Sequence, residues 1–186
     1  SEGKHIITSR IEHPSVLEPC RWLERNGFQV TYIPVDEHGL VDPARIEEEI
    51  REDTILVSIM HANNEVGTIE PIEELGAICW ERGVLFHTDA VQSFGKVDID
   101  VKRLPVDMLA ISAHKFYGPK GVGALWLRKG VKIYALIDGG GQEGGLRAGT
   151  ENVAGIVGMA KAVELLQRRG EEDRKKLAEL GKRLIS

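Results

Sequence analysis

One lysine in this chain has a setting that suits covalent chemistry with a carbonyl group. Lys115 lies in the run SAHKFYGPKG at residues 112–121, directly after the apolar run MLAI at residues 108–111. The apolar run predicts a buried strand, and ligand sites in open α/β sheets lie at the carboxyl ends of such strands. A partly desolvated lysine there can have its pKa lowered enough to form a Schiff base. The alternative is a solvated lysine at the mouth of a loop, which the run alone favours.

Other polar side chains also follow predicted strands. Each comes at or shortly after the end of an apolar run: His13, Asn63, Asn64, Asp89, Gln92, Ser112 and His114. In a parallel sheet these strand ends lie along one edge, so the side chains can converge on one ligand.

Their chemical types suit a cofactor that combines a pyridine ring, an aldehyde and a phosphate. A carboxylate must pair with the protonated ring nitrogen to keep the ring an electron sink, and Asp89 can do this. The imidazole of His13 can lie flat on the ring. The remaining donors are the amides of Gln92 and Asn64, for the phenolic oxygen and a substrate carboxylate, and Ser112 with His114, for the phosphate.

The elements that would position these residues alternate between strand-like and helix-like runs. Strands are predicted at residues 5–8, 28–35, 54–60, 84–87, 108–112 and 123–127, and helices at residues 14–26, 43–51 and 71–82. Asp42 followed by Pro43 is typical of a helix start. The rhythm and the apolar strands predict a three-layer αβα fold with a mostly parallel sheet. The connection at residues 115–122 is too short for a helical crossover, which predicts one antiparallel strand at the end.

The character of the chain changes after Gly130. Residues 138–150 are rich in glycine and are predicted to be irregular, and apolar residues recur at helical spacing from Val153 onward. The charged tail, residues 171–186, carries a leucine stripe that needs a partner surface. We therefore expect residues 1–152 to form the sheet, its helices and an active-site loop, and residues 153–186 a helix. The chain as a whole, residues 1–186, is expected to be part of a longer protein.

Composition narrows the possible functions. The 186 residues are 42% hydrophobic and 28% charged, which is ordinary for a globular protein, and the net charge of −5 argues against nucleic acid as a ligand. No apolar run approaches the roughly 20 residues that span a bilayer. Cys20 and Cys79 are interpreted as buried small hydrophobes without metal-ligand spacing, which fits a reducing, cytoplasmic setting and no metal site. Four histidines are interpreted as structural or surface residues: His61 and His87 as structural, His5 and His38 as surface residues.

Taken together, the motifs resemble the class V aminotransferase family of fold type I, and specifically the NifS/IscS-type cysteine desulfurases. The resemblance covers nearly the whole chain in the family's order. It rests on ITSRIEH at 7–13, MHANNEVG at 60–67, HTDAVQ at 87–92, SAHKFYGPKG at 112–121, GGGQE at 139–143 and LRAGTEN at 146–152. The LRAGT form is more similar to the NifS/IscS branch than to the selenocysteine-lyase-like branch.

The resemblance implies pyridoxal 5′-phosphate as cofactor and a role for each motif residue. Lys115 would form the Schiff base, Asp89 would pair with the ring nitrogen, and His13 would stack on the ring and move protons. The other implied roles are the ring hydroxyl for Gln92, the substrate carboxylate for Asn64, the phosphate for Ser112 and His114, and, across a homodimer, the partner's phosphate for Thr150. Apart from the resemblance, Arg147 is interpreted either as an anion-binding residue or as one that holds its loop by an internal ion pair.

The implied activity is removal of sulfur from L-cysteine, giving alanine and an enzyme persulfide for iron–sulfur cluster or thio-cofactor synthesis. The implied partners are L-cysteine, a second copy of the chain and a sulfur-acceptor or iron–sulfur scaffold protein. The family's phosphate-cradling loop would precede Ser1, and its small domain, with the catalytic cysteine, would follow Ser186. We therefore expect these residues alone to be inactive. The alternatives are another class V enzyme, such as a selenocysteine lyase or an aminotransferase, and a non-catalytic module for cofactor binding or dimerisation.

Overall fold

The computed structural model describes residues 3–185, and it divides into two compact units. The first unit holds the residues up to 111 together with 125–127, and the second holds 112–124 and the residues from 128 onward. The outer limits of the predicted domain, residues 1 and 186, lie outside the described residues. The boundary expected near residue 152 stays a prediction.

The first unit is built on a six-stranded sheet in the order β2-β1-β3-β4-β5-β6. The strands are β1 (His5–Ser9), β2 (Gln29–Ile33), β3 (Thr54–Ser58), β4 (Leu85–Asp89), β5 (Met108–Ser112) and β6 (Gly123–Leu127). The first five are parallel to their neighbours, and β6 is antiparallel to β5. The predicted mostly parallel sheet with one antiparallel strand is therefore confirmed.

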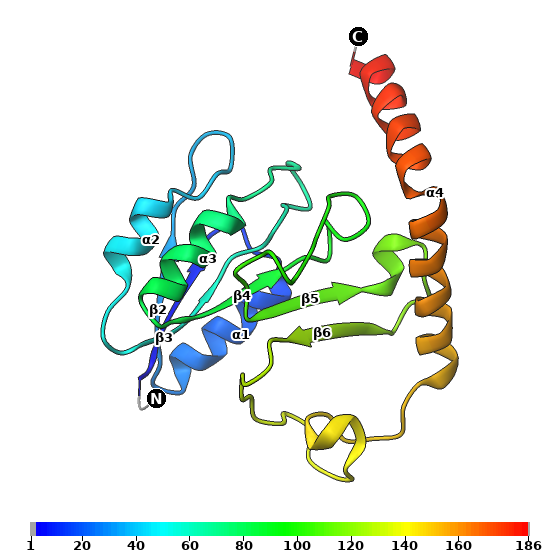
Figure 1. Cartoon of the computed structure of the whole chain (residues 1–186). Helices are drawn as coiled ribbons and strands as arrows, with labels where there is room; N and C mark the ends of the chain where they lie inside the picture. The colour runs from blue at the N-terminus through cyan, green and yellow to red at the C-terminus, as the bar shows by residue number, and fades with distance from the viewer. Residues whose placement is uncertain (1–2, 186) are drawn as a thin grey trace. The chain divides into compact units, whose positions relative to one another are not determined.

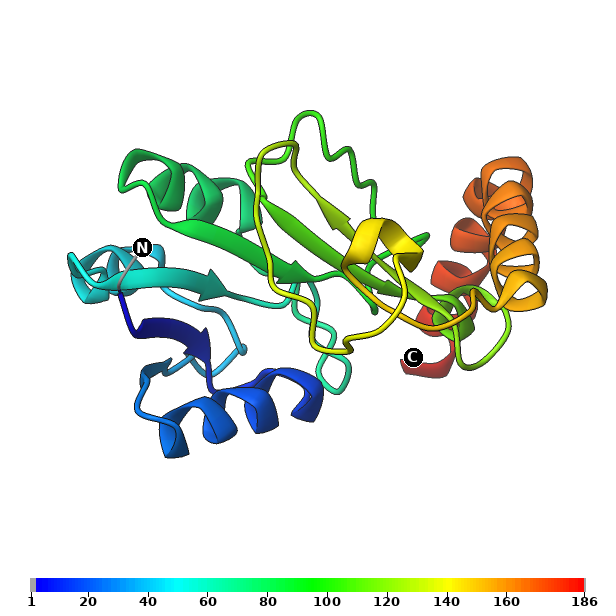
Figure 2. The same ribbon diagram turned by 90° about the horizontal axis from the view of Figure 1, so that it is seen from below.

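Helices cover both faces of the sheet (Figure 1). Figure 2 shows α1 (Pro14–Arg25) on one face, with α2 (Pro43–Glu49) and α3 (Ile72–Glu81) on the other. The predicted start of α2 is confirmed, because Asp42 accepts the N–H of Ala44 at 2.9 Å through Oδ1 and Pro43 is the first helical residue. Together the three layers match the predicted αβα arrangement.

The strand order creates a switch in chain direction between β1 and β3. The chain leaves β1 through α1 toward β2, whereas it leaves β3 through α3 toward β4, on the opposite side. Crossover connections between parallel strands are right-handed. Helices that lead the chain in opposite directions along the sheet therefore lie on opposite faces of it. The loops at the ends of β1 and β3 therefore diverge, and this is where open α/β sheets bind ligands.

The main hydrophobic core lies between the sheet and the α2–α3 layer. It combines inward side chains of the strands with those of the two helices: Ile7, Ile33, Val57, Phe86, Leu109, Ile46, Ile72, Leu75 and Cys79. All of these are at most 4% exposed. On the other face, α1 buries Cys20. Both cysteines are thus buried and unpaired, as predicted.

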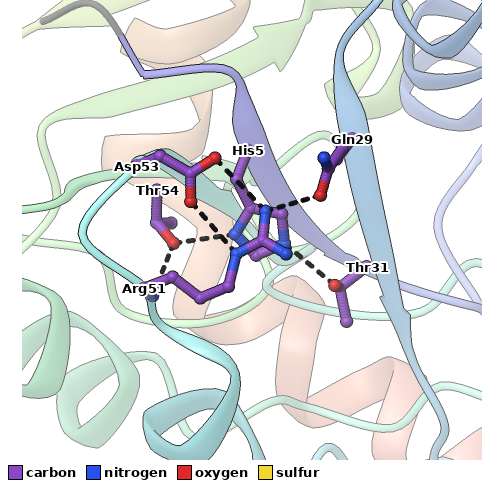
Figure 3. A network of polar contacts seen from close by, with 6 residues as sticks. All are labelled: His5, Gln29, Thr31, Arg51, Asp53 and Thr54. Carbon is purple, nitrogen blue, oxygen red and sulfur yellow. Dashed lines mark hydrogen bonds and ion pairs between the residues drawn. The ribbon is translucent and has the colours of Figure 1, made fainter.

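The prediction that His5 is a surface residue is wrong. His5 is fully buried because β1 has a paired strand on each side. Its Nδ1 lies 2.7 Å from the Thr54 hydroxyl and its Nε2 lies 2.9 Å from the Thr31 hydroxyl (Figure 3). Arg51 closes the network by donating to Gln29 at 2.9 Å and by pairing with Asp53. The network lies at the amino ends of β1 to β3, away from the candidate site.

The second unit begins with the last residue of β5. A short 3₁₀ turn, η1 (Ala113–Phe116), follows β5, and a second 3₁₀ turn, η2 (Gln142–Gly145), interrupts the glycine-rich loop that was predicted to be irregular. The helix predicted from Val153 is a single element, α4 (Val153–Ile185). Pro119 packs closely on α4, since a Cβ atom added to Gly158 would lie 2.5 Å from its Cγ atom. Within residues 3–185, no helix combines the length and apolar character needed to cross a membrane.

Candidate active site

The loop that follows β1 places His13 at the start of α1. Its Nδ1 accepts the backbone N–H of Ser15 at 3.1 Å and lies 2.8 Å from the Ser15 hydroxyl. Pro14 is the first helical residue, where a missing N–H costs no hydrogen bond. The imidazole is exposed. Because the cap uses only the edge of the ring, it leaves the ring face to a flat ligand.

The loop that follows β3 is shaped by Asn63. Its Nδ2 donates to the carbonyl of Ile11 at 3.0 Å, and its Oδ1 accepts the N–H groups of Glu65 and Val66 at 2.9 and 3.0 Å. Asn63 is buried, whereas Asn64 is exposed. The buried amide therefore fixes the turn that presents the amide of Asn64.

Asp89 is the last residue of β4 and is only 8% exposed. Its Oδ1 accepts the N–H of Val91 at 2.8 Å, and its backbone carbonyl accepts the N–H of His61 at 2.9 Å. Gln92, partly exposed, accepts a hydrogen bond from Nζ of Lys96 at 3.1 Å. The bond from Val91 fixes the orientation of the Asp89 carboxylate at the strand end.

Hydrogen bonds join these three loops along one edge of the sheet. The loop after β1 is bonded twice to the loop after β3, which in turn is bonded to the end of β4. The first unit thus brings together the loops that carry His13, Asn64 and Asp89, at the direction switch of the sheet.

Sequence reasoning missed the residue that makes one of these links. Glu12 is 4% exposed, and its Oε1 accepts the hydroxyl of Ser9 at 2.7 Å and the N–H of Met60 at 2.8 Å. Burial raises the pKa of this carboxyl to about 7. The two hydrogen bonds act in the opposite direction and lower the pKa, whereas the charge of Asp89 adds a smaller increase. The available signal was a glutamate between a buried strand and a helix start, but that pattern does not reveal burial.

Two histidines of the site edge have structural surroundings, which fits the role predicted for them. His61 is 6% exposed, and burial lowers its pKa. Nδ1 of His87 lies 2.8 Å from the hydroxyl of Ser58 on the neighbouring strand, and burial lowers its pKa as well. Both rings are therefore held neutral near pH 7.

In the second unit, η1 carries the candidate lysine. Lys115 and His114 are exposed, while Ala113 and Phe116 on the same turn are buried and anchor it. The partial desolvation expected for Lys115 is therefore not found in the chain as described. Nδ1 of His114 lies 2.8 Å from the hydroxyl of Ser112, so the two predicted phosphate donors are neighbours.

The turn that carries Lys115 ends in a strained residue. Tyr117 adopts a left-handed conformation with φ of 67°, which is uncommon for a residue with a side chain. The N–H of Gly118 donates to the carbonyl of Ala113 at 2.9 Å, and the N–H of Ala113 donates to the carbonyl of Val122 at 3.0 Å. Such strain concentrates at functional sites, where the surrounding contacts hold it in place.

The glycine-rich loop is held by its own polar groups. Oε1 of Gln142 accepts the N–H of Gly149 at 3.1 Å, and Arg147 donates to the carbonyl of Gly149 at 3.3 Å. This bond of Arg147 goes to a backbone carbonyl, so the two roles considered for it, anion binding and an internal ion pair within the loop, stay predictions. Thr150 follows directly and is exposed.

The eight candidate residues divide evenly between the units. The first unit carries His13, Asn64, Asp89 and Gln92, and the second carries Ser112, His114, Lys115 and Thr150. Within the described residues, no group of three or more His, Cys, Asp or Glu side chains could hold a metal ion. The convergence of both groups on one ligand, and the role of each residue, stay predictions.

Comparison with known protein families identifies the family of the chain. The profile described as Aminotransferase class-V matches residues 1–185. The chain belongs to the class-V aminotransferase family, and the predicted resemblance to that family is confirmed.

Within this family, the chain is similar to several named proteins and solved structures. The chain is 60% identical to the cysteine desulfurase IscS of Dictyoglomus turgidum over 97% of its own length, and 59% identical to that of Methanosarcina thermophila over 99%. It spans only 46% of each of these relatives. Among solved structures, a NifS-like protein matches the whole chain with a TM-score of 0.96 and 49% identity, and the chain covers 51% of it. SspA in complex with cysteine matches 88% of the chain with a TM-score of 0.85 and 51% identity, and 48% of SspA is covered.

Proposed function

We propose that this chain is the cofactor-binding portion of a cysteine desulfurase that depends on pyridoxal 5′-phosphate. The observation that carries the proposal is the identity of about 60% with proteins named cysteine desulfurase IscS, which extends over nearly all of the chain. Because the chain spans about half the length of these relatives, the proposal concerns the activity of a larger protein to which it contributes one part.

The polar side chains of the two units fit this cofactor. The first unit offers a buried carboxylate, Asp89, an exposed imidazole, His13, and the amides of Asn64 and Gln92. The second unit offers the exposed amine of Lys115, with the hydroxyl of Ser112 three residues before it and the imidazole of His114 one residue before it. A charged ring nitrogen needs a carboxylate, an aldehyde needs an amine, and a phosphate needs hydroxyl and imidazole donors.

Each residue would then have one task. When bound, the cofactor supplies an electron sink that weakens bonds at the substrate α-carbon. Lys115 would anchor the cofactor through its amine and afterwards move protons at that carbon. Asp89 would hold the proton on the ring nitrogen, and His13 would stack on the ring and shuttle a proton.

The remaining polar groups would orient the bound molecules. Gln92 would donate to the ring hydroxyl oxygen, and Asn64 would donate to the carboxylate of L-cysteine. Ser112 and His114, which already contact each other, would turn toward the phosphate. Thr150, exposed at the end of its loop, would reach the phosphate of a second copy in a homodimer. A monomeric mass at high concentration, with cofactor present, would count against that last role.

Sulfur transfer needs a reactive thiolate that attacks the substrate sulfur, breaking its bond to carbon and giving alanine and a persulfide. Burial raises the pKa of Cys20 to about 11 and that of Cys79 to about 12, so neither forms a thiolate readily. We therefore propose that this thiolate comes from outside these 186 residues. The acceptor of the sulfur is proposed to be a scaffold protein of iron–sulfur cluster or thio-cofactor synthesis. Two buried, unpaired cysteines fit a cytoplasmic setting.

The test is covalent labelling of the chain with pyridoxal 5′-phosphate. We expect a visible absorbance band on addition of the cofactor, and borohydride reduction followed by peptide mass mapping should place the label on Lys115. Lys115→Ala should abolish the band, whereas Lys120→Ala, an exposed lysine five residues away, should retain it. Label spread over many lysines, or equal labelling of Lys115→Ala, would overturn the assignment.

A second assay addresses catalysis. We expect no alanine from L-cysteine with the chain alone, and alanine when the missing portion is supplied. Turnover of selenocysteine but not cysteine by the completed protein would favour the selenocysteine lyase alternative. Cofactor labelling without turnover of any amino acid in the completed protein would favour a non-catalytic module.

A further inference from the structure

The carboxyl of Glu12 lies between the ends of β1 and β3, where the chain direction along the sheet switches. Oε1 accepts hydrogen bonds from the hydroxyl of Ser9, at the end of β1, and from the N–H of Met60, just beyond β3. Strands β1 and β3 are neighbours, but the chain leaves them toward opposite faces. One oxygen atom therefore holds together two loops that would otherwise diverge.

A second link reinforces the first from the opposite side. The amide of Asn63 donates to the carbonyl of Ile11, the residue before Glu12, and its oxygen holds the N–H groups of Glu65 and Val66. The segment that ends in His13 and the turn that presents Asn64 are thus joined at two points. Displacing either loop changes the position of both exposed site residues.

The charge state of Glu12 depends first on its burial and then on its neighbours. Asp89 at the end of β4 and Glu70 before α3 both act on it with negative charge, and Cys20 on α1 is near it as a neutral thiol. Its second oxygen, Oε2, is buried and has no hydrogen-bond partner among the described residues. Burial raises the pKa of Glu12 to about 7, so the carboxyl changes between its neutral and its ionised form near neutral pH.

We propose that Glu12 is a positioning residue of the candidate cofactor site, whose carboxyl ties the loops of His13 and Asn64 together beside Asp89, the group that would face the ring nitrogen. The proposal rests on the function proposed above. Ionisation of Glu12 places a second negative charge beside Asp89 and weakens the hold on an anionic cofactor. The effect acts through the loops and through charge, because Glu12 itself is buried.

Glu70 offers a matched control. It is 3% exposed, one carboxylate oxygen accepts the N–H of Val41 at 2.9 Å, and the other is buried without a partner among the described residues. Burial raises its pKa as well. Glu70 belongs to the loop after β3, and its side chain links that loop to the hairpin after β2 rather than to the loop of His13. Substitution of Glu70 therefore removes a similar buried carboxyl without loosening the same link.

The experiment compares Glu12→Gln, Glu12→Ala and Glu70→Ala by titration with pyridoxal 5′-phosphate. Glu12→Ala leaves the N–H of Met60 without its acceptor and should weaken cofactor binding about tenfold. Glu12→Gln keeps an oxygen acceptor and carries no charge. Its affinity for the cofactor should therefore equal that of the unchanged chain at about pH 6. As the pH rises toward about 8, the variant should bind the cofactor progressively more tightly than the unchanged chain does. Glu70→Ala should lower stability and keep the affinity at about pH 6, which is where this control is read because the charge of Glu70 contributes to the raised pKa of Glu12. Unchanged affinity in Glu12→Ala, or a Glu12→Gln ratio that does not vary with pH, would overturn the proposal.

A second readout does not depend on the cofactor. Hydrogen exchange of the cofactor-free chain should be faster at the N–H groups of Glu65 and Val66 in Glu12→Ala than in Glu70→Ala, although Glu12 touches neither group. If the unchanged chain forms no adduct at Lys115, the proposed function fails, and exchange alone decides whether Glu12 positions the loop. Equal exchange in both variants would contradict the positioning role.

Discussion

Two of the candidate site residues also support their local backbone. The ring of His13 caps α1, and the carboxylate of Asp89 holds the N–H of Val91 beyond β4. Substitutions at these positions therefore change structure and chemistry together, unless the new side chain keeps the oxygen or nitrogen that accepts the bond. At Asp89 the chain allows that separation, since asparagine retains Oδ1 and removes the negative charge.

For Asp89→Asn we expect near-unchanged stability, weaker binding of pyridoxal 5′-phosphate and a shifted absorbance maximum, because the ring nitrogen loses its countercharge. Asp89→Ala should show the same defects and also lose about 1 kcal/mol of stability with the bond to Val91. Absorbance titration and urea unfolding measure the two effects. Wild-type affinity and spectrum in Asp89→Asn would reduce Asp89 to a structural role.

Among the elements, one glycine of α3 and one glycine near the end of α4 have opposite surroundings. A Cβ atom on Gly76 of α3 would lie 2.3 Å from the carbonyl oxygen of Pro105, so this glycine lets α3 pack closely on the connection between β4 and β5. Gly181 of α4 has no atom within 4 Å of the corresponding point. The first glycine is therefore required by packing, while the second only adds backbone freedom.

We expect Gly76→Ala to destabilise the chain by about 1–3 kcal/mol, despite the better helix propensity of alanine, because the backbone of Pro105 must move. Gly181→Ala should stabilise α4 by about 0.5–1 kcal/mol. Thermal unfolding followed by helical circular dichroism would measure both changes. A stabilising Gly76→Ala would show that α3 and Pro105 separate at little cost.

Across the first unit as a whole, buried titratable groups at the two edges of the sheet respond to pH in opposite directions. Burial, followed by the charge of Arg51, lowers the pKa of His5 at the amino edge. A lowered pKa means that the fold resists protonation, so its stability is full above about pH 6.5 and falls as the pH drops below that value. The raised pKa of Glu12 has the opposite sign, since its contribution is present at low pH and is lost as the pH rises toward about 7.

When the pH falls from about 7.5 to about 5, the free energy of unfolding should therefore decrease less in His5→Gln than in the unchanged chain. This holds even if the variant is less stable at both pH values. Urea midpoints at the two pH values give the comparison. His38→Gln, at an exposed position, controls for loss of an imidazole without loss of the buried network. An identical decrease in His5→Gln and the unchanged chain would mean that other groups set the acid sensitivity.

The sequence predicted the elements well where local signals were strong. The bounds of β5 and β6 match the prediction, and the pair Asp42 and Pro43 located the start of α2. The strand expected at residues 28–35 is shorter in the structure because hydrogen bonding with β1 covers only Gln29 to Ile33.

Features that depend on strand order were not predictable from local patterns. The burial of His5 requires knowing that β1 lies between β2 and β3, and the link made by Glu12 requires knowing that the ends of β1 and β3 meet. The types of the candidate site residues could be recognised in the sequence, whereas the side chains that hold their loops could not.

The central place of β1 also bears on synthesis of the chain. One edge of this strand pairs with β2, but the other waits for β3, which begins only after α1, β2 and α2 have been made. At about 5–20 residues per second, Ile6 and Ile7 lie beside an open edge for several seconds on the ribosome. Open apolar edges recruit other strands, so we expect translation speed between β1 and β3 to influence how much protein aggregates. Comparing soluble yields from fast- and slow-codon versions of this interval would measure that dependence.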